Sequence, residues 1–313
     1  MLNIVFLDRA SLPVDVRAPN IAHHWTAYDA TSKVDVIARL ADADIAISNK
    51  VRLDAETIAA LPRLKLIAVA ATGTNNVDVD AARARNIPVC NIRGYADNTV
   101  PEHALMLMLA LARSLPAYRQ DLADGAWQRS PYFCHFGAPI RDLSGRTLAI
   151  IGNGSLGKRT AALASAFGMR VLCADHKGAS ARPGYTAFGD ALREADIVSL
   201  HCPLTPETRG LIGGAELASM KPDAILINTA RGGLVDEAAL LDALRNGRLG
   251  GAGLDVVQEE PPVNGNALLD VQLPNLIITP HVGWASRDAM ERLAEQLMGN
   301  IEAWAKGAPR NLV

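Results

Sequence analysis

Short runs of β-branched residues alternate with amphipathic stretches over the first hundred residues of the chain. The runs that predict strands are Asn3–Leu7, Ile45–Ser48, Leu66–Val69 and Val89–Asn91. Helical periodicity separates them, for example in Ser32–Ala41 and Ala55–Ala60. Because strands that alternate with helices form βαβ units, this part predicts a parallel sheet covered by helices.

A longer helix is expected after these elements. Thr99-Val100-Pro101-Glu102 has the pattern of a capping box, with proline in the first turn, where its missing N–H does no harm. The apolar residues continue through Leu115, which predicts a helix that is buried all round and suits a position between two domains. The segment Trp127–Arg141, rich in aromatic residues and proline, is expected to form a long loop.

The second half has a clearer pattern of the same kind. Apolar runs predict strands at Thr147–Ile151, Val171–Ala174, Ile197–Leu200, Ala224–Asn228, Gly251–Asp255 and Leu276–Thr279. Six strands with helices between them are typical of a doubly wound, dinucleotide-binding sheet. The final helix, Arg287–Lys306, follows the completed sheet, and we expect it to return to the first domain and make that domain discontinuous.

Composition and charge narrow the classes of function. The chain has 313 residues, of which 49% are hydrophobic and 20% charged, as in a globular protein of two domains. A net charge of −2 does not indicate a nucleic-acid partner or an anionic membrane surface. The longest apolar run, Ala104 to Ala112, is about half of the ~20 residues that cross a bilayer. The N-terminus lacks the pattern of a signal peptide and predicts a first strand instead.

The four cysteines are widely spaced and form no Cys-x-x-Cys pair, so neither a zinc ribbon nor a redox pair is predicted. They are Cys90, Cys134, Cys173 and Cys202. We interpret them as buried free thiols of a cytoplasmic protein. No cluster of candidate ligands has metal-binding spacing, so no metal site is predicted.

A glycine-rich motif links the first strand of the second half to a helix. The strand ending at Ile151 leads directly into Gly152-Asn153-Gly154-Ser155-Leu156-Gly157, and an alanine-rich helical stretch follows. In a G-x-G-x-x-G loop the first glycine permits the tight turn, the second lets the backbone approach a pyrophosphate, and the third allows close packing of helix and strand. The free N–H groups at the helix start then face the phosphates.

An acidic residue ends the next strand, 18 positions beyond Gly157. This residue, Asp175, is placed to accept hydrogen bonds from both ribose hydroxyls of NAD and to repel the 2′-phosphate of NADP. The alternative is that Asp175 caps a helix. This acid makes NAD the expected cofactor. NADP stays possible, because His176 and Lys177 are adjacent potential cations that would tolerate a 2′-phosphate.

Three polar segments lie at the predicted carboxyl ends of strands, where the chemistry of such sheets takes place. They contain Arg231, Glu260 and His281. Hydride transfer to a 2-oxo acid requires a cation that holds the carboxylate, an acid that protonates the carbonyl oxygen, and a carboxylate that stabilises the charged imidazole. Arginine, histidine and glutamate supply these three functions. Glu259 precedes Glu260, so the acid could lie one position earlier.

Through these and other segments, the chain resembles the D-isomer-specific 2-hydroxyacid dehydrogenase family over nearly its whole length. The matching motifs are Gly152–Gly157 with Asp175, His201-Cys202-Pro203-Leu204-Thr205, Ile227-Asn228-Thr229-Ala230-Arg231-Gly232, Gly253-Leu254-Asp255-Val256, Glu260-Pro261 and Pro280-His281-Val282-Gly283. The glycerate dehydrogenase/hydroxypyruvate reductase branch is further indicated by Ala71-Thr72-Gly73-Thr74-Asn75-Asn76-Val77-Asp78, Gly125-Ala126-Trp127 and His176-Lys177-Gly178-Ala179.

The resemblance implies roles for the residues in these motifs. Arg231 would bind the substrate carboxylate, His281 would be the acid–base, and Glu260, which directly precedes Pro261 as in the family, would raise the pKa of His281. The backbone around Thr72 and Gly73 would hold the other side of the carboxylate. The cofactor would contact Thr99, Gly152, Gly154, Ser155, Leu156, Gly157, Asp175, Pro203, Thr229, Ala230, Asp255 and Gly283, with Asp255 on the nicotinamide carboxamide.

The resemblance also implies an architecture of two Rossmann- or flavodoxin-like parallel-sheet domains with the active-site cleft between them. Residues 1–98 and 286–313 would form the substrate-binding domain, and residues 99–285 the NAD-binding domain. The protein would pair through its dinucleotide domains as a homodimer.

The expected reaction is the reduction of hydroxypyruvate or glyoxylate, running backwards as a glycerate dehydrogenase. Phosphoglycerate dehydrogenase is an alternative specificity, less favoured because the chain ends near residue 313 without room for a regulatory domain. A non-catalytic, NAD-sensing corepressor on the same fold is the alternative of another class. Such a protein is expected to have a long disordered tail, which this sequence does not contain.

Overall fold

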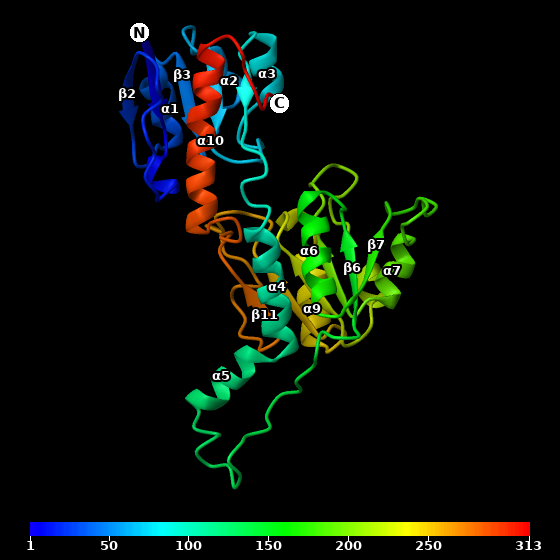
Figure 1. The fold of residues 1–313 in the computed structure, drawn as a ribbon. Coiled ribbons are helices and arrows are strands. Elements are labelled where there is room, and N and C mark those ends of the chain that lie inside the picture. Colours follow the sequence, from blue (N-terminus) through cyan, green and yellow to red (C-terminus); the bar gives the residue numbers. More distant parts are fainter. The chain divides into compact units, whose positions relative to one another are not determined.

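The computed structural model describes residues 1–313 and divides them into two compact units. Unit 1 comprises Met1–Tyr95 and Ala285–Val313, and unit 2 comprises Ala96–Trp284. Both boundaries lie within three residues of the predicted domain limits at 98/99 and 285/286. The last helix, α10 (Arg287–Ala305), therefore belongs with the N-terminal segment although almost two hundred residues separate them along the chain (Figure 1).

Unit 1 contains a five-stranded parallel sheet of order β2-β1-β3-β4-β5. Its strands are β1 (Leu2–Phe6), β2 (His23–Ala27), β3 (Ile45–Ser48), β4 (Leu66–Val69) and β5 (Val89–Cys90). Besides α10, its helices are α1 (Val36–Leu40), α2 (Ala55–Ala59) and α3 (Val79–Ala84), with 3₁₀ turns η1 (Arg9–Ser11) and η2 (Lys33–Asp35). Four of the strands were predicted, whereas β2 and α3 were not.

Unit 2 contains a six-stranded parallel sheet of order β11-β10-β9-β8-β6-β7. The strands are β6 (Thr147–Ile151), β7 (Arg170–Ala174), β8 (Ile197–Leu200), β9 (Ile225–Asn228), β10 (Gly251–Leu254) and β11 (Leu276–Ile278), which confirms all six predictions. The helices are α4 (Thr99–Ala112), α5 (Leu115–Ala123), α6 (Ser155–Ala166), α7 (Phe188–Glu194), α8 (Gly214–Ser219) and α9 (Glu237–Arg245), with the 3₁₀ turn η3 (Gly232–Leu234).

The direction of winding reverses between β6 and β8, because β7 lies on one side of β6 and all later strands lie on the other. Helices cover both faces of this sheet. Alternate residues of β6 show this, since Leu148 and Ile150 pack in a core with α4 and α6, while Ala149 and Ile151 pack in a core with α7, α8 and α9. In such sheets ligands bind beyond the carboxyl ends of the strands, at the switch point.

Three details of the predicted long helix are wrong. The helix is not buried all round, because Met106 is 42% exposed. The helix begins at Thr99 with Asn98 as its N-cap and without a side-chain cap hydrogen bond, so the capping box does not form. The apolar run to Leu115 is also broken, because Ser114 has a φ of 50° and separates α4 from α5. The segment after α5 lacks regular structure up to β6, as predicted for the loop Trp127–Arg141. No helix is both long and apolar enough to cross a membrane.

The four cysteines are unpaired, as predicted, but only Cys90 is buried. Burial raises the pKa of the Cys90 thiol to about 12, so this side chain stays protonated and behaves as a small hydrophobic residue. The other three cysteines are partly accessible, which corrects the expectation that all four are buried.

The amino end of each sheet is held by an aspartate that precedes a central strand. In unit 1, Asp44 accepts the backbone N–H of Asn3 at 2.9 Å and pairs with Lys65 at 3.0 Å. In unit 2, Asp196 accepts the backbone N–H of Thr147 at 2.8 Å and pairs with Lys221 at 2.9 Å. Each carboxylate thus ties two neighbouring strands together at the edge opposite to the one where ligands bind.

We expect Asp196→Asn to lower the free energy of unfolding at neutral pH and to make that free energy less dependent on pH in the acid range. Burial alone would raise the pKa of Asp196, but the N–H of Thr147 and the charge of Lys221 outweigh burial and lower it. Such a group stabilises the fold above its unfolded pKa of about 4, and this contribution is lost as the pH falls. Denaturant unfolding at pH 7 should show a loss of about 1–3 kcal/mol.

The same series between pH 5 and pH 3 should give a shallower fall in unfolding free energy for Asp196→Asn than for the unaltered chain. The control is Asp190→Asn, which removes an exposed ion pair with Arg193 on α7 and should cost less than about 1 kcal/mol. Parallel pH profiles for Asp196→Asn and the unaltered chain would contradict this account.

Candidate active site

The three predicted catalytic side chains follow three neighbouring strands of unit 2. Arg231 follows β9, Glu260 lies in the segment after β10, and His281 follows β11. The strands pair in parallel in the order β11-β10-β9, so their carboxyl ends lie at one edge of the sheet. The strand order alone therefore brings the three residues to the same end of the unit.

His281 and Glu260 form a direct pair. The Nδ1 atom of His281 lies 2.7 Å from Oε2 of Glu260, and each side chain keeps about a third of its surface exposed, at 34% and 33%. Glu259 instead accepts a hydrogen bond from Asn264 at 2.8 Å. Between the two glutamates left open by the sequence, the structure pairs Glu260 with the imidazole.

The carboxyl group of Glu260 is ionised at neutral pH. Burial alone would raise the pKa of Glu260, but the hydrogen bond and charge of His281, the N–H of Val257 and the charge of Arg231 together lower it. The Val257 N–H donates to Oε1 at 3.0 Å, which leaves Oε2 for the imidazole. An ionised partner on Nδ1 keeps a proton on that nitrogen and leaves Nε2 for a substrate.

Arg231 is placed by a tight contact between two loops. A Cβ atom on Gly232 would lie 1.9 Å from the carbonyl oxygen of Val257, so only glycine allows the loop after β9 to lie against the loop that carries Glu260. The buried Asn228 side chain shapes the same loop, donating to the Arg231 carbonyl at 2.8 Å and accepting from the Ala230 N–H at 3.1 Å. The Arg231 guanidinium donates to the Ala230 carbonyl at 2.7 Å.

The backbone of His281 is fixed in a strained conformation, with a φ of 55°. Non-glycine residues rarely adopt such angles, and they often occur at functional sites. Asp255, 2% exposed, supports this loop by accepting the N–H groups of Val282 at 2.9 Å and Gly283 at 2.7 Å and the hydroxyl of Thr279. The predicted contact of Asp255 with a nicotinamide carboxamide stays a prediction, and positioning His281 is a second role.

His103 contributes to the same network and was not predicted to do so. This residue of α4 places Nε2 2.9 Å from the Thr279 hydroxyl and 3.5 Å from the Asp255 carboxylate. A Cβ atom on Gly283 would approach the His103 ring to 3.2 Å and Asp255 to 2.8 Å, so the loop needs glycine there. The sequence placed position 103 within the predicted long helix but gave no sign of a partner for its side chain.

The glycine loop has the shape that a pyrophosphate requires. Gly152 has a φ of 101°, and a Cβ atom there would lie 2.5 Å from the backbone of His201. A Cβ atom on Gly157 would lie 2.0 Å from the Gly152 carbonyl oxygen, whereas one on Gly154 would meet nothing within 4 Å. The first and third glycines are thus needed for packing, and the second faces open space beside the start of α6, where no side chain caps the helix.

The other predicted cofactor residues of unit 2 lie around this loop. Ser155 and Leu156 begin α6, and the Ser155 hydroxyl donates to Asp97, two residues before Thr99, at 3.2 Å. Pro203 follows β8, on the other side of the switch point, beyond the His201 backbone that touches Gly152. The hydroxyl of Thr229 is buried without a hydrogen-bond partner in the chain, which leaves it available to a water or a bound ligand.

Known proteins of similar sequence and fold identify the family of this chain. Residues 105–283 match the family model described as D-isomer specific 2-hydroxyacid dehydrogenase, NAD binding domain. The chain is 52% identical to glycerate dehydrogenase of Methylorubrum extorquens over 99% of its own length and 98% of the relative's. The chain belongs to the D-isomer specific 2-hydroxyacid dehydrogenase family.

Two further relatives support the family and its fold. Hydroxypyruvate reductase of Blautia hydrogenotrophica is 38% identical over 100% of this chain and 99% of its own. The structure of D-lactate dehydrogenase from Aquifex aeolicus, in complex with NAD and lactic acid, superposes with a TM-score of 0.82 at 29% identity and covers 98% of this chain and 96% of that one. The protein is accordingly an NAD(P)-dependent oxidoreductase that acts on the CH–OH group of its donors.

In this dehydrogenase the predicted ribose-binding acid already has a partner. Asp175 receives a bidentate ion pair from Arg182, whose Nη2 lies 2.7 Å from Oδ1. No helix starts at Asp175, since α7 begins at Phe188, so the helix-cap alternative is wrong. Lys177, one of the two cations expected beside Asp175, pairs instead with Glu216 at 2.9 Å. The cation that does pair with Asp175 is Arg182, seven residues later, which was not predicted from the sequence.

The dehydrogenase places Thr72 and Gly73, the two predicted substrate residues of unit 1, after β4 at the carboxyl edge of its own sheet. The Thr72 hydroxyl donates to the Ile92 carbonyl at 2.6 Å, and the Asn91 side chain donates to the Thr72 carbonyl at 2.8 Å. These two bonds hold the loop through the hydroxyl and the carbonyl group of Thr72 and do not use its backbone N–H groups. Their role toward a carboxylate stays a prediction.

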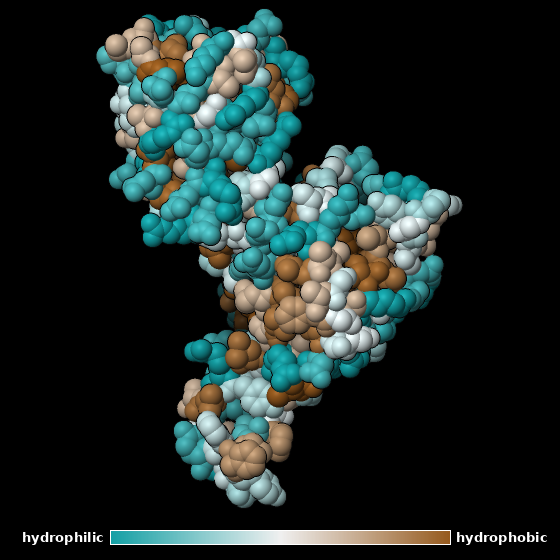
Figure 2. Space-filling view, in the orientation of Figure 1, coloured by the Kyte–Doolittle hydropathy of each residue, from teal (hydrophilic) through white to brown (hydrophobic).

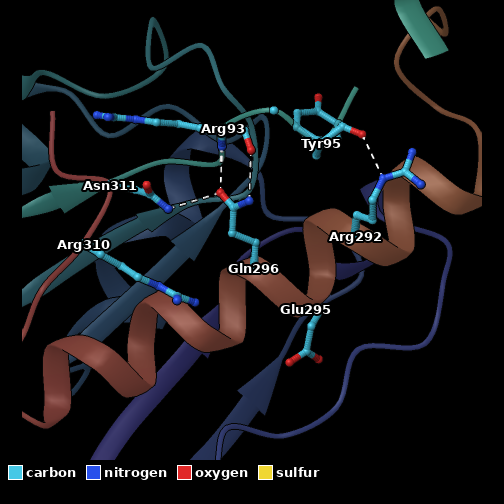
Figure 3. A pocket seen from close by; sticks show the side chains of 8 residues that line it. Arg93, Tyr95, Arg292, Glu295, Gln296, Arg310 and Asn311 are labelled. Carbon is cyan, nitrogen blue, oxygen red and sulfur yellow. Dashed lines mark hydrogen bonds between the residues drawn. The ribbon is translucent and has the colours of Figure 1, made fainter. Parts of the chain in front are cut away.

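Unit 1 also contains a pocket of about 540 Å³ between α10 and the segment that follows β5. Its lining includes Arg93, Arg292 and Arg310, but Figure 3 shows the guanidinium groups of Arg93 and Arg292 pointing away from one another. Gln296 exchanges two hydrogen bonds with the backbone of Arg93, at 2.7 and 3.0 Å. These hydrogen bonds attach α10 to the segment after β5. None of the predicted site residues lines the pocket.

Proposed function

We propose that this dehydrogenase reduces hydroxypyruvate or glyoxylate to the corresponding 2-hydroxy acid and that, in reverse, it oxidises glycerate. The names of the relatives at 52% and 38% identity, glycerate dehydrogenase and hydroxypyruvate reductase, support this substrate class. The observation that carries the proposal is the 2.7 Å pair of His281 with Glu260, beside Arg231, on the sheet that carries the glycine loop.

Bound NAD(P)H supplies the hydride for C2 of the substrate. The Arg231 guanidinium holds the substrate carboxylate with two aligned donors and so orients the carbonyl group. The His281 Nε2–H donates a proton to the carbonyl oxygen as negative charge develops there. Ionised Glu260 stabilises the imidazolium before the transfer and fixes the ring orientation through Nδ1.

The test is a panel of 2-oxo acids at fixed NADH and at fixed NADPH. We expect hydroxypyruvate and glyoxylate to have the highest kcat/KM, and a phosphorylated 3-carbon 2-oxo acid to be turned over poorly. A preference for the phosphorylated substrate would favour phosphoglycerate dehydrogenase instead. Tight NADH binding without turnover of any 2-oxo acid would favour the sensor on the same fold.

We further propose that the enzyme is a cytoplasmic homodimer that pairs through unit 2. Exposed apolar side chains on and after α5 are Leu115, Leu122, Trp127, Tyr132, Phe133, Phe136 and Ile140. Phe133 is 93% and Phe136 83% exposed, and Figure 1 shows this segment extending away from the rest of unit 2. Figure 2 shows further apolar surface over α4 and α6. So much exposed aromatic surface is unusual for a monomer and suits an interface between copies.

The double variant Phe133→Ser, Phe136→Ser should dimerise more weakly, because each substitution removes a large apolar side chain from the proposed interface. Sedimentation velocity should give about twice the chain mass of 33.2 kDa for the unaltered protein and a concentration-dependent shift towards the monomer for the variant. The control is Val263→Ser, an exposed apolar residue after β10. A monomeric unaltered chain at micromolar concentration would contradict the proposal.

A further inference from the structure

The carboxylate of Asp175 is occupied to an unusual degree for a residue expected to bind ribose. Its side chain is 1% exposed and accepts the backbone N–H groups of His176 at 2.8 Å and Arg182 at 2.9 Å. It also accepts Nε of Arg182 at 3.0 and 2.9 Å and Nη2 at 2.7 Å. Little acceptor capacity is left for a ribose hydroxyl while Arg182 stays in place.

Arg182 is held over the site by more than this ion pair. Its guanidinium carbon lies 4.5 Å from the centre of the Tyr185 ring, a cation–π distance. The Tyr185 hydroxyl in turn accepts a hydrogen bond from the Asn153 side chain, inside the glycine loop, at 3.3 Å. A continuous set of contacts therefore joins Arg182 to the loop proposed to hold the pyrophosphate.

The guanidinium is nevertheless accessible. The Arg182 side chain is 56% exposed, and its Nη1 lies outside the ion pair with Asp175. Arginine matches the geometry of a phosphate with paired donors, and in this kind of sheet an arginine close to the ribose-binding acid accommodates the 2′-phosphate of NADP.

The pair changes the electrostatics of the site. Asp175 alone would present a negative charge that repels a 2′-phosphate, but Arg182 cancels that charge. The other nearby cation, Lys177, is committed to Glu216 and to the Leu211 carbonyl at 3.4 Å. Arg182 is therefore the cation placed to meet a phosphate.

We infer that Arg182 is a specificity-determining residue of the nucleotide site: it neutralises Asp175 and offers its guanidinium to the 2′-phosphate, so that the enzyme binds both NADH and NADPH. With NADPH, Arg182 pairs with the phosphate. With NADH, its exposed side chain turns away and frees Asp175 for the ribose. The inference rests on the proposed function only in requiring that the glycine loop binds a dinucleotide.

The test is calorimetric titration with NADH and with NADPH, which needs no turnover. Arg182→Met keeps an unbranched apolar side chain and removes the charge and the donors. We expect it to weaken NADPH binding about tenfold to a hundredfold, because charge-assisted hydrogen bonds to the phosphate are lost. NADH binding should stay unchanged or become tighter, because Arg182 no longer competes for Asp175. Arg182→Lys, which keeps the charge but not the paired donors, should lie between.

The matched control is Arg193→Met, which removes an exposed arginine paired with Asp190 on α7 and should leave both affinities unchanged. Equal loss of NADH and NADPH binding in Arg182→Met would show that Arg182 only shapes the loop, and would overturn the inference. Unaltered protein that binds NADH but not NADPH would also overturn it while leaving the proposed function intact. Protein that binds neither would contradict the nucleotide site itself.

Discussion

The variant His281→Ala has no measurable turnover with hydroxypyruvate but binds NADH with nearly unchanged affinity: this is the largest effect that we expect. A positioned general acid contributes about 10²–10⁴ to the rate, and no other imidazole pairs with Glu260. The glycine loop and α6, which form the proposed pyrophosphate site, do not involve His281. Steady-state kinetics and NADH titration on the same preparation measure the two effects.

The chain offers a matched control for this variant. His135 forms a similar pair with Asp121, with Nε2 and Oδ2 3.0 Å apart, in the segment after α5. His135→Ala should keep turnover within about threefold, since surface pairs of this kind contribute little. Near-normal activity of His281→Ala, or a loss of NADH binding as large as the loss of turnover, would contradict the assignment.

Arg231→Lys is expected to have the second largest effect, on substrate rather than on cofactor. A lysine ammonium keeps the charge but cannot reproduce the two aligned donors of a guanidinium. The loss of one charge-assisted hydrogen bond corresponds to about 3 kcal/mol at most, or about two orders of magnitude in kcat/KM. We expect a large increase in KM for the 2-oxo acid and little change in NADH affinity.

The control is Arg245→Lys, an exposed arginine at the end of α9, which should leave kcat/KM unchanged. Arg231→Lys also loses some support for Glu260, because the charge of Arg231 helps to lower the pKa of that carboxyl group. An unchanged KM for the 2-oxo acid in Arg231→Lys would show that another cation holds the carboxylate.

Most of the sheet framework was predictable because its strands are buried apolar runs. All four residues of β3, β4, β8, β9 and β10 are buried, so their patterns stand out in the sequence. The edge strand β2, His23–Ala27, has no buried residue and therefore no such pattern. The break between α4 and α5 depends on the left-handed conformation of Ser114, which an uninterrupted apolar run does not reveal.

The candidate site was predictable as far as residue types and strand order determine it. Arg231, Glu260 and His281 follow strands that proved to be neighbours, and the choice of Glu260 over Glu259 came from the adjacent proline. The ion pair of Asp175 with Arg182 was not predictable, because it depends on how the loop after β7 folds back. The contact of His103 with Thr279 joins residues 176 positions apart and carries no local signal.

The central claim is that hydride passes directly between C4 of a nicotinamide and C2 of a small 2-oxo acid on this chain. The most direct measurement uses NADH that carries deuterium at both C4 positions, with hydroxypyruvate and the purified enzyme, followed by NMR and chiral analysis of the product. The account predicts one deuterium at C2 of glycerate in the D configuration, at the full enrichment of the cofactor. Product without deuterium at C2, or no product while NADH remains bound, would contradict it.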